Sequence, residues 1–128
     1  MPADSEFLVR YITSRRHYRS DLTVKPEAFT PNPYTELSVT KKDKLTDDQL
    51  WAIGKDIVQE SDPPKSLHGR SEFDLTTARD FTLPVKPDPT PKNPHHVVIY
   101  NWPVGKPDQK IHALKIAEVA SNLILPPT

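Results

Sequence analysis

The sequence predicts an α+β fold, in which a small and mostly antiparallel sheet carries two amphipathic helices packed on one face. Short runs rich in β-branched and aromatic residues indicate strands. Two longer segments, at about 46–60 and 107–124, carry apolar residues at helical spacing. The order is strands, helix, short strand, long connection, strand and helix, which favours α+β over a strictly alternating parallel sheet.

The first strand is expected at 6–13, where apolar side chains fall on both faces, a pattern typical of a central strand. A basic and polar connection follows at 14–21. Further strands are expected, in chain order, at 22–25, 36–41, 67–73 and 95–102.

The first helix has a well-marked start. Thr46 and Gln49 have the spacing of a capping box, and Leu45 and Leu50 occupy the two positions of a hydrophobic staple. Gly54 lies inside the helix, where glycine costs about 1 kcal/mol relative to alanine. We therefore expect Gly54 to mark close packing of the helix on a strand, rather than the approach of a ligand.

The second helix begins near Pro107, because proline suits a first helical turn. Its core-facing stripe is expected to consist of Ala113, Ile116, Ala117, Ala120 and Ile124.

The segment 84–94 contains five prolines and is typical of extended polyproline II. Only 34 residues follow it, too few for a second core, so we expect a surface crossover within a single domain spanning 1–128. One or two helical turns are expected before it, at 76–81.

Composition excludes several classes of function. The absence of cysteine excludes disulfide frameworks, zinc ribbons, thiol catalysis and iron–sulfur clusters. Three glycines are too few for a Gly-rich phosphate loop, and neither expected helix carries metal-ligand spacing, so no cofactor and no metal are expected. No apolar run reaches the roughly 18 residues of a membrane span, and the N-terminus lacks signal-peptide features, so a cytoplasmic protein is expected.

Basic residues concentrate in one segment, although seventeen basic and seventeen acidic residues balance over the chain. Guanidinium groups bind phosphates, and interleaved tyrosines, here Tyr11 and Tyr18, offer stacking surfaces for bases. The segment 10–25 is therefore a candidate for binding an anionic ligand or single-stranded nucleic acid, or else a solvated loop whose cations pair with carboxylates elsewhere. Its cations are Arg10, Arg15, Arg16, Arg19 and Lys25, against the single acid Asp21.

Histidines offer a second type of chemistry. His17, His68 and His96 could act as acid and base in phosphodiester cleavage without a metal, with Arg15, Arg16 or Arg70 stabilising the developing charge. Arg70 lies near His68 in a turn and is also a candidate phosphate ligand. His95 and His96 are adjacent in a strand and point to opposite faces, so they are not expected to chelate one metal.

Three functions remain open on the sequence alone. The first is a small intracellular binding module for a protein partner or an anionic ligand, acting through the basic segment 10–25. The second is a metal-independent ribonuclease, or another phosphodiester-processing enzyme of the small toxin type. The third is a structural or antidote-like protein partner, which would use the proline-rich crossover and exposed strand edges.

Overall fold

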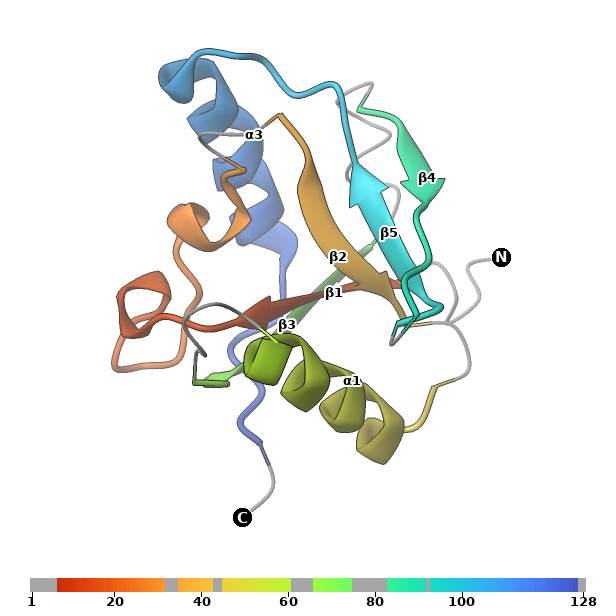
Figure 1. Ribbon diagram of the computed structural model, residues 1–128. Helices are drawn as coiled ribbons and strands as arrows, with labels where there is room; N and C mark the ends of the chain where they lie inside the picture. Colours follow the sequence, from red (N-terminus) through yellow and green to blue (C-terminus); the bar gives the residue numbers. More distant parts are fainter. Residues whose placement is uncertain are drawn as a thin grey trace.

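The computed structural model describes residues 7–31, 35–42, 45–60, 66–74, 83–91 and 93–126. These residues form a five-stranded antiparallel sheet and two α-helices, so the α+β class is confirmed (Figure 1). No helix among these residues is long and apolar enough to cross a membrane.

The strands follow the order β3-β1-β2-β5-β4 across the sheet. Their bounds are β1 Phe7–Ile12, β2 Leu37–Lys41, β3 Gly69–Asp74, β4 Val85–Pro87 and β5 His96–Ile99. The α-helices are α1 Asp47–Glu60 and α3 Lys106–Val119, and two short 3-10 helices are η2 Arg15–His17 and η3 Pro26–Phe29.

The pairing of β1 differs on its two sides. Towards β3 it runs the full length of the strand, from Phe7–Asp74 to Ile12–Gly69. Towards β2 only two residue pairs are in register, Leu8–Lys41 and Val9–Thr40. Beyond Val9 the two strands diverge, as Figure 1 shows, and this divergence makes room for a side chain between them.

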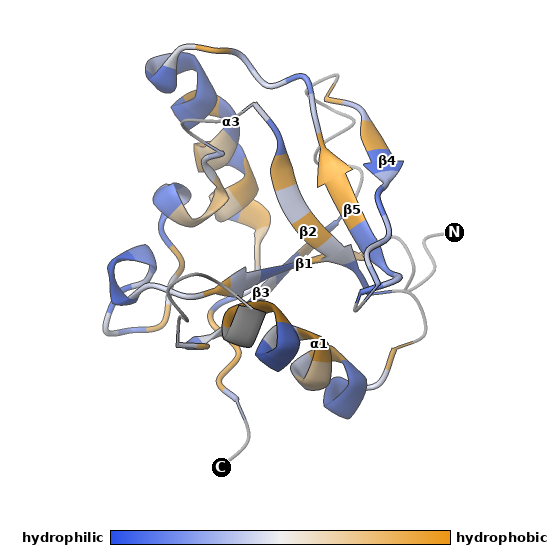
Figure 2. Ribbon diagram, in the orientation of Figure 1, coloured by the Kyte–Doolittle hydropathy of each residue, from blue (hydrophilic) through white to orange (hydrophobic). Residues whose placement is uncertain are grey.

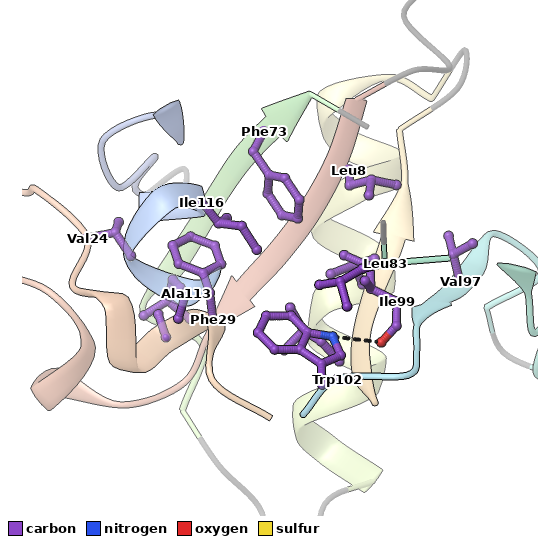
Figure 3. Packing of buried hydrophobic residues seen from close by; sticks show 14 of the residues in the cluster. Leu8, Val24, Phe29, Phe73, Leu83, Val97, Ile99, Trp102, Ala113 and Ile116 are labelled. Atoms are coloured by element: carbon purple, nitrogen blue, oxygen red, sulfur yellow. Dashed lines mark hydrogen bonds between the residues drawn. The ribbon is translucent and has the colours of Figure 1, made fainter. Parts of the chain in front are cut away.

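The two helices lie on opposite faces of the sheet, so the expectation that both pack on one face is wrong. Leu8 and Ile12 of β1 belong to the main core, which includes residues of α3. Val9 and Tyr11 point the other way and pack with Leu50 of α1. Figure 3 shows α3 and the core side chains on one side of the strands and α1 on the other. The physical reason is that β1 is apolar on both faces, and each face needs a cover.

The main core is built around three buried aromatic residues from three segments. Phe29 of η3 meets Phe73 of β3 edge to face, with ring centroids 5.6 Å apart at 81°. Trp102 is buried beside them in the same core and donates its indole N–H to the carbonyl of Ile99 at 3.0 Å. Figure 3 shows these rings packed with Ile116 of α3.

The predicted start of α1 is confirmed in detail. The Thr46 N–H donates to Oε1 of Gln49 at 2.8 Å, and the Gln49 N–H donates back to Oγ1 of Thr46 at 3.2 Å. Leu45 packs in the same cluster as Leu50. The interpretation of Gly54 is also confirmed, because a Cβ there would lie 2.7 Å from Cε1 of Tyr11 on β1.

The end of α3 differs from the sequence prediction. The helix ends at Val119 rather than 124, because the chain then runs beside β3. There the Ser121 N–H donates to the Glu72 carbonyl at 2.9 Å, and the Ile124 N–H donates to the Arg70 carbonyl at 2.8 Å. These bonds cover the outer edge of β3 and compete successfully with continued helix.

Four other predictions change or lie outside the described residues. The segment 84–94 is not all polyproline II, because Val85–Pro87 forms β4 and pairs with β5. Val24 makes only an isolated bridge, with Tyr18, so 22–25 is not a strand, and Leu22 has a φ of 70°. β5 ends at Ile99, before an Asn101 with a φ of 66°. The turns expected at 76–81 lie outside the described residues.

Candidate anion-binding cleft

An open cleft of about 690 Å³ lies on the α3 side of the sheet, between η3, β2 and the beginning of α3. We call it the basic cleft. Its walls combine three cations and a histidine with two carboxylates: Arg10, Lys106, Lys110, His17, Glu27 and Glu36.

Arg10 occupies the space left where β1 and β2 diverge. Its Nε donates to the carbonyl of Ala28 and its Nη1 to the carbonyl of Ser38, both at 2.9 Å. Burial lowers the pKa of Arg10 to about 10, so the group stays charged at neutral pH. Within the described part of the chain, no carboxylate forms a salt bridge with it. A part-buried cation whose described hydrogen-bond partners are neutral carbonyls keeps a charge that an anion could neutralise.

Lys106 and Lys110 enter the cleft from the first two turns of α3. They are four residues apart and therefore share one helix face. The N-terminus of a helix is its positive end, so two lysines there oppose the helix dipole, and Gly105 supplies no side-chain cap. Helix stability therefore does not explain their position. Lys106 and Lys110 were not predicted from the sequence, although a lysine pair at a helix start without a side-chain cap is a signal that points to them.

Residues 14–25, which we call the basic turn, place His17 in the cleft wall and leave the neighbouring arginines exposed. Ser14 caps η2 by accepting a hydrogen bond from the Arg16 N–H at 3.2 Å. The Arg15 side chain lies over the Tyr18 ring, 4.6 Å from its centroid, and donates to the Tyr18 carbonyl.

The rest of the basic turn holds this arrangement in place. The Lys25 N–H donates to the His17 carbonyl at 2.8 Å, which ties the two ends of the turn together, although Lys25 does not line the cleft. The exposed Arg19 donates to Oγ1 of Thr23 at 3.3 Å. Asp21 accepts two hydrogen bonds from Thr23, from the hydroxyl at 2.7 Å and the N–H at 3.1 Å, and these bonds lower its pKa.

The two tyrosines of this segment do not form the stacking surface that the sequence suggested. Tyr11 is buried under α1 and donates its hydroxyl hydrogen to the Leu50 carbonyl at 2.5 Å. Burial raises the pKa of Tyr11. Tyr18 packs partly against the main core, bonds its hydroxyl to Nδ1 of His68 at 3.1 Å and is covered by Arg15. A ligand at this surface would therefore meet cations rather than open aromatic rings.

The structure does not bring the three candidate catalytic histidines into one cleft. His17 lines the basic cleft, whereas His68 is not among its lining residues and its ring contacts Tyr18, with ring centroids 5.7 Å apart. His96 lines two other clefts, and its Nδ1 lies 2.7 Å from the carbonyl oxygen and 3.3 Å from Oδ2 of Asp88. Across the described residues, no group of three His, Asp or Glu side chains is placed to hold a metal.

Arg70 has a structural environment rather than an open one. Its side chain is 4% exposed and donates to Glu72 and to Asp47, each at 2.9 Å. It also lies over the Trp51 ring, 4.7 Å from the centroid. These contacts tie β3 to the start of α1, so Arg70 does not reach the basic cleft. No local sequence pattern predicted that Arg70 is buried.

Comparison of the chain with models of known protein families, with curated proteins and with solved structures gave no significant match. Function is therefore inferred from the geometry of the basic cleft and the basic turn.

Proposed function

We propose that the chain is a binding module for a phosphate-bearing anionic ligand, held in the basic cleft and on the basic turn. The observation that carries this proposal is Arg10, a part-buried guanidinium on the cleft wall whose described partners are two backbone carbonyls. Its remaining N–H groups suit a phosphate oxygen, since guanidinium groups bind phosphates strongly. Lys106 and Lys110 supply further positive charge around the same space.

The charge balance of this surface supports the proposal. The basic turn and the basic cleft together carry seven arginines and lysines against three carboxylates. The whole chain has a formal net charge of zero, so the positive charge is concentrated on one side. Such a patch attracts anions and raises the rate of their association.

The ligand class that fits best is the backbone of a single-stranded nucleic acid. The cations sit on an exposed turn and in an open cleft, which suits an extended chain of phosphates. Tyr11 is unavailable for stacking, so recognition would rest on phosphates and would depend little on base sequence. We also propose that the protein acts in the cytoplasm, as expected from its sequence.

The experiment is fluorescence anisotropy with a labelled single-stranded RNA in EDTA, over a series of salt concentrations. Each phosphate neutralised in a single strand contributes about −0.7 to the slope of log K against log salt. Replacing Arg15, Arg16 and Arg19 with alanine should therefore flatten the slope by about 2. Thermal stability should change little, because all three side chains are exposed.

A matched control removes three exposed cations elsewhere. Lys41, Lys55 and Lys86 are exposed and line no part of the basic cleft. The triple alanine variant at these positions should bind RNA nearly as well as the unchanged protein. Equal losses in both triple variants, or binding that does not respond to salt, would contradict the proposal.

A second candidate is phosphodiester cleavage without a metal. It is favoured by one observation, that His17 shares the basic cleft with Glu27, Glu36 and Arg10. A histidine and a carboxylate can serve as acid and base, and an arginine can stabilise the charge that develops on phosphorus. The same RNA samples, run on a denaturing gel, test it: cleavage in EDTA that is lost in His17→Ala supports it, and intact RNA rules it out. If RNA neither binds nor is cut, a protein partner becomes the hypothesis to pursue.

A further inference from the structure

Exposed apolar side chains gather around one helix. Of the large apolar residues that are exposed in the described part of the chain, all but Ile57 lie in α3, just before it, or in the segment after it that runs beside β3. They are Val104, Ile111, Leu114, Val119 and Leu125. The opposite side of α3 is already in the main core, through Ala113 and Ile116. The helix therefore has apolar residues on both sides, and Figure 2 shows the two colours mixed along it.

The exposed residues include a narrow seam. Pro107, Ile111, Leu114 and Glu118 are spaced four, three and four residues apart, which is the spacing of a coiled-coil contact line. Ile111 is 58% exposed and Leu114 is 48% exposed. We call these four residues the α3 seam. A helix face that contacts only water does not require apolar residues at this spacing.

The charges beside the seam match a reversed copy of the same helix. Asp108 and Lys115 are exposed, seven residues apart, on one flank of the seam. If two seams meet antiparallel, with Ile111 of each copy against Leu114 of the other, Asp108 of one copy faces Lys115 of the other. Two-fold symmetry makes this contact twice. A parallel arrangement would instead bring Lys110 towards Lys115, which is unfavourable.

We propose that the α3 seam is the interface of a symmetric antiparallel dimer of this chain. The contact is short, with two apolar side chains from each copy at its centre, so it belongs with the small and transient interfaces. We therefore expect weak self-association, with a dissociation constant in the micromolar range or above. The proposal is independent of ligand binding, since the test residues lie outside the basic cleft and the basic turn.

The first test is analytical ultracentrifugation of the whole chain between about 5 and 500 µM, a range chosen to span the expected affinity. The unchanged protein should pass from monomer to dimer over this range. Leu114→Glu places a charge in the seam and should leave a monomer throughout. Val104→Glu is the matched control, an equal change at an exposed apolar residue before the helix, and should dimerise normally. Circular dichroism verifies that each variant folds.

The second test distinguishes an antiparallel dimer from other forms of self-association. Asp108→Lys and Lys115→Asp each create like-charge contacts with their own copy and should dimerise at least tenfold more weakly. Mixed together, the two variants restore both attractive contacts and should form a heterodimer. A monomer at every concentration, equal effects of the Leu114 and Val104 substitutions, or no heterodimer in the mixture would each overturn the proposal.

Discussion

Replacing Gly54 with alanine should destabilise the protein, although alanine is the better helix former. The added Cβ would lie 2.7 Å from Cε1 and 2.9 Å from Cδ1 of Tyr11, and 3.1 Å from Cδ2 of Leu67. The Tyr11 ring has little freedom to move away, because it is 9% exposed and its hydroxyl bonds to the Leu50 carbonyl.

Three contributions determine the expected change in the free energy of unfolding, one favouring alanine and two opposing it. Helix propensity favours alanine by about 1 kcal/mol. Overpacking costs about 1–3 kcal/mol, and displacing the Tyr11 hydroxyl from its carbonyl would add about 1–3 kcal/mol for a buried group without a partner. We therefore expect a net loss of about 1–5 kcal/mol in the free energy of unfolding, with about 3 kcal/mol as the central value.

Urea unfolding, followed by the fluorescence of the two buried tryptophans, Trp51 and Trp102, measures this loss. The control is the same substitution in a Tyr11→Val background, where the ring is absent. There Gly54→Ala should raise the free energy of unfolding by up to about 1 kcal/mol, because helix propensity then opposes only the milder contact with Leu67. A Gly54→Ala protein as stable as the original, or equal effects in both backgrounds, would refute the packing of α1 against this face of β1.

Three further predictions concern the buried residues. Burial raises the pKa of Tyr11, so its phenol should stay protonated in the folded protein above pH 10. The buried, protonated phenol contributes stability below pH 10, and this contribution is lost as the pH rises further. Tyr11→Phe should leave the phenolate absorbance of the folded protein unchanged, and a smaller absorbance would contradict the burial. Arg70→Met should lower the free energy of unfolding in urea by about 2–4 kcal/mol, because the largely buried Glu72 loses a partner. An unchanged free energy of unfolding would show that the ion pair is exposed to solvent. Phe29→Ala should cost about 3–5 kcal/mol by removing the edge-to-face contact with Phe73, whereas a loss below 1 kcal/mol would contradict the core.

Elements with local signals were predictable from the sequence. The start of α1 is specified by the capping box of Thr46 and Gln49, which lie three residues apart and need no tertiary context. β1 followed from its β-branched and aromatic run. The apolar stripe of α3 was also correct at Ala113 and Ile116, which are fully buried.

The errors arose where distant segments decide the outcome. The end of α3 depends on hydrogen bonds from Ser121 and Ile124 to β3, about 50 residues earlier in the chain. The two apolar faces of β1 already indicated that each face is covered by a helix, so the prediction of both helices on one face was wrong. A strand that is apolar on both sides at the centre of a sheet calls for a layer on each side.

The candidate site was predictable only in part, for the same reason. The sequence identified Arg10 and the basic turn as a local excess of charge. It did not join them to Lys106 and Lys110, which tertiary folding brings to the same cleft from nearly 100 residues away. Nor did it separate the exposed Arg16 from the buried Arg70, because both are arginines in polar surroundings along the chain.

The central claim is that phosphates bind around Arg10, and an NMR titration tests it most directly. A short single-stranded RNA is added to ¹⁵N-labelled protein, and the Nε–H signal of Arg10 is followed with the backbone amides of His17, Lys106 and Lys110. We predict that these four signals shift together and saturate at one affinity, while Lys55 stays unchanged. Shifts that leave the Arg10 Nε–H in place, or that spread evenly over all exposed lysines, would contradict a binding site in the basic cleft.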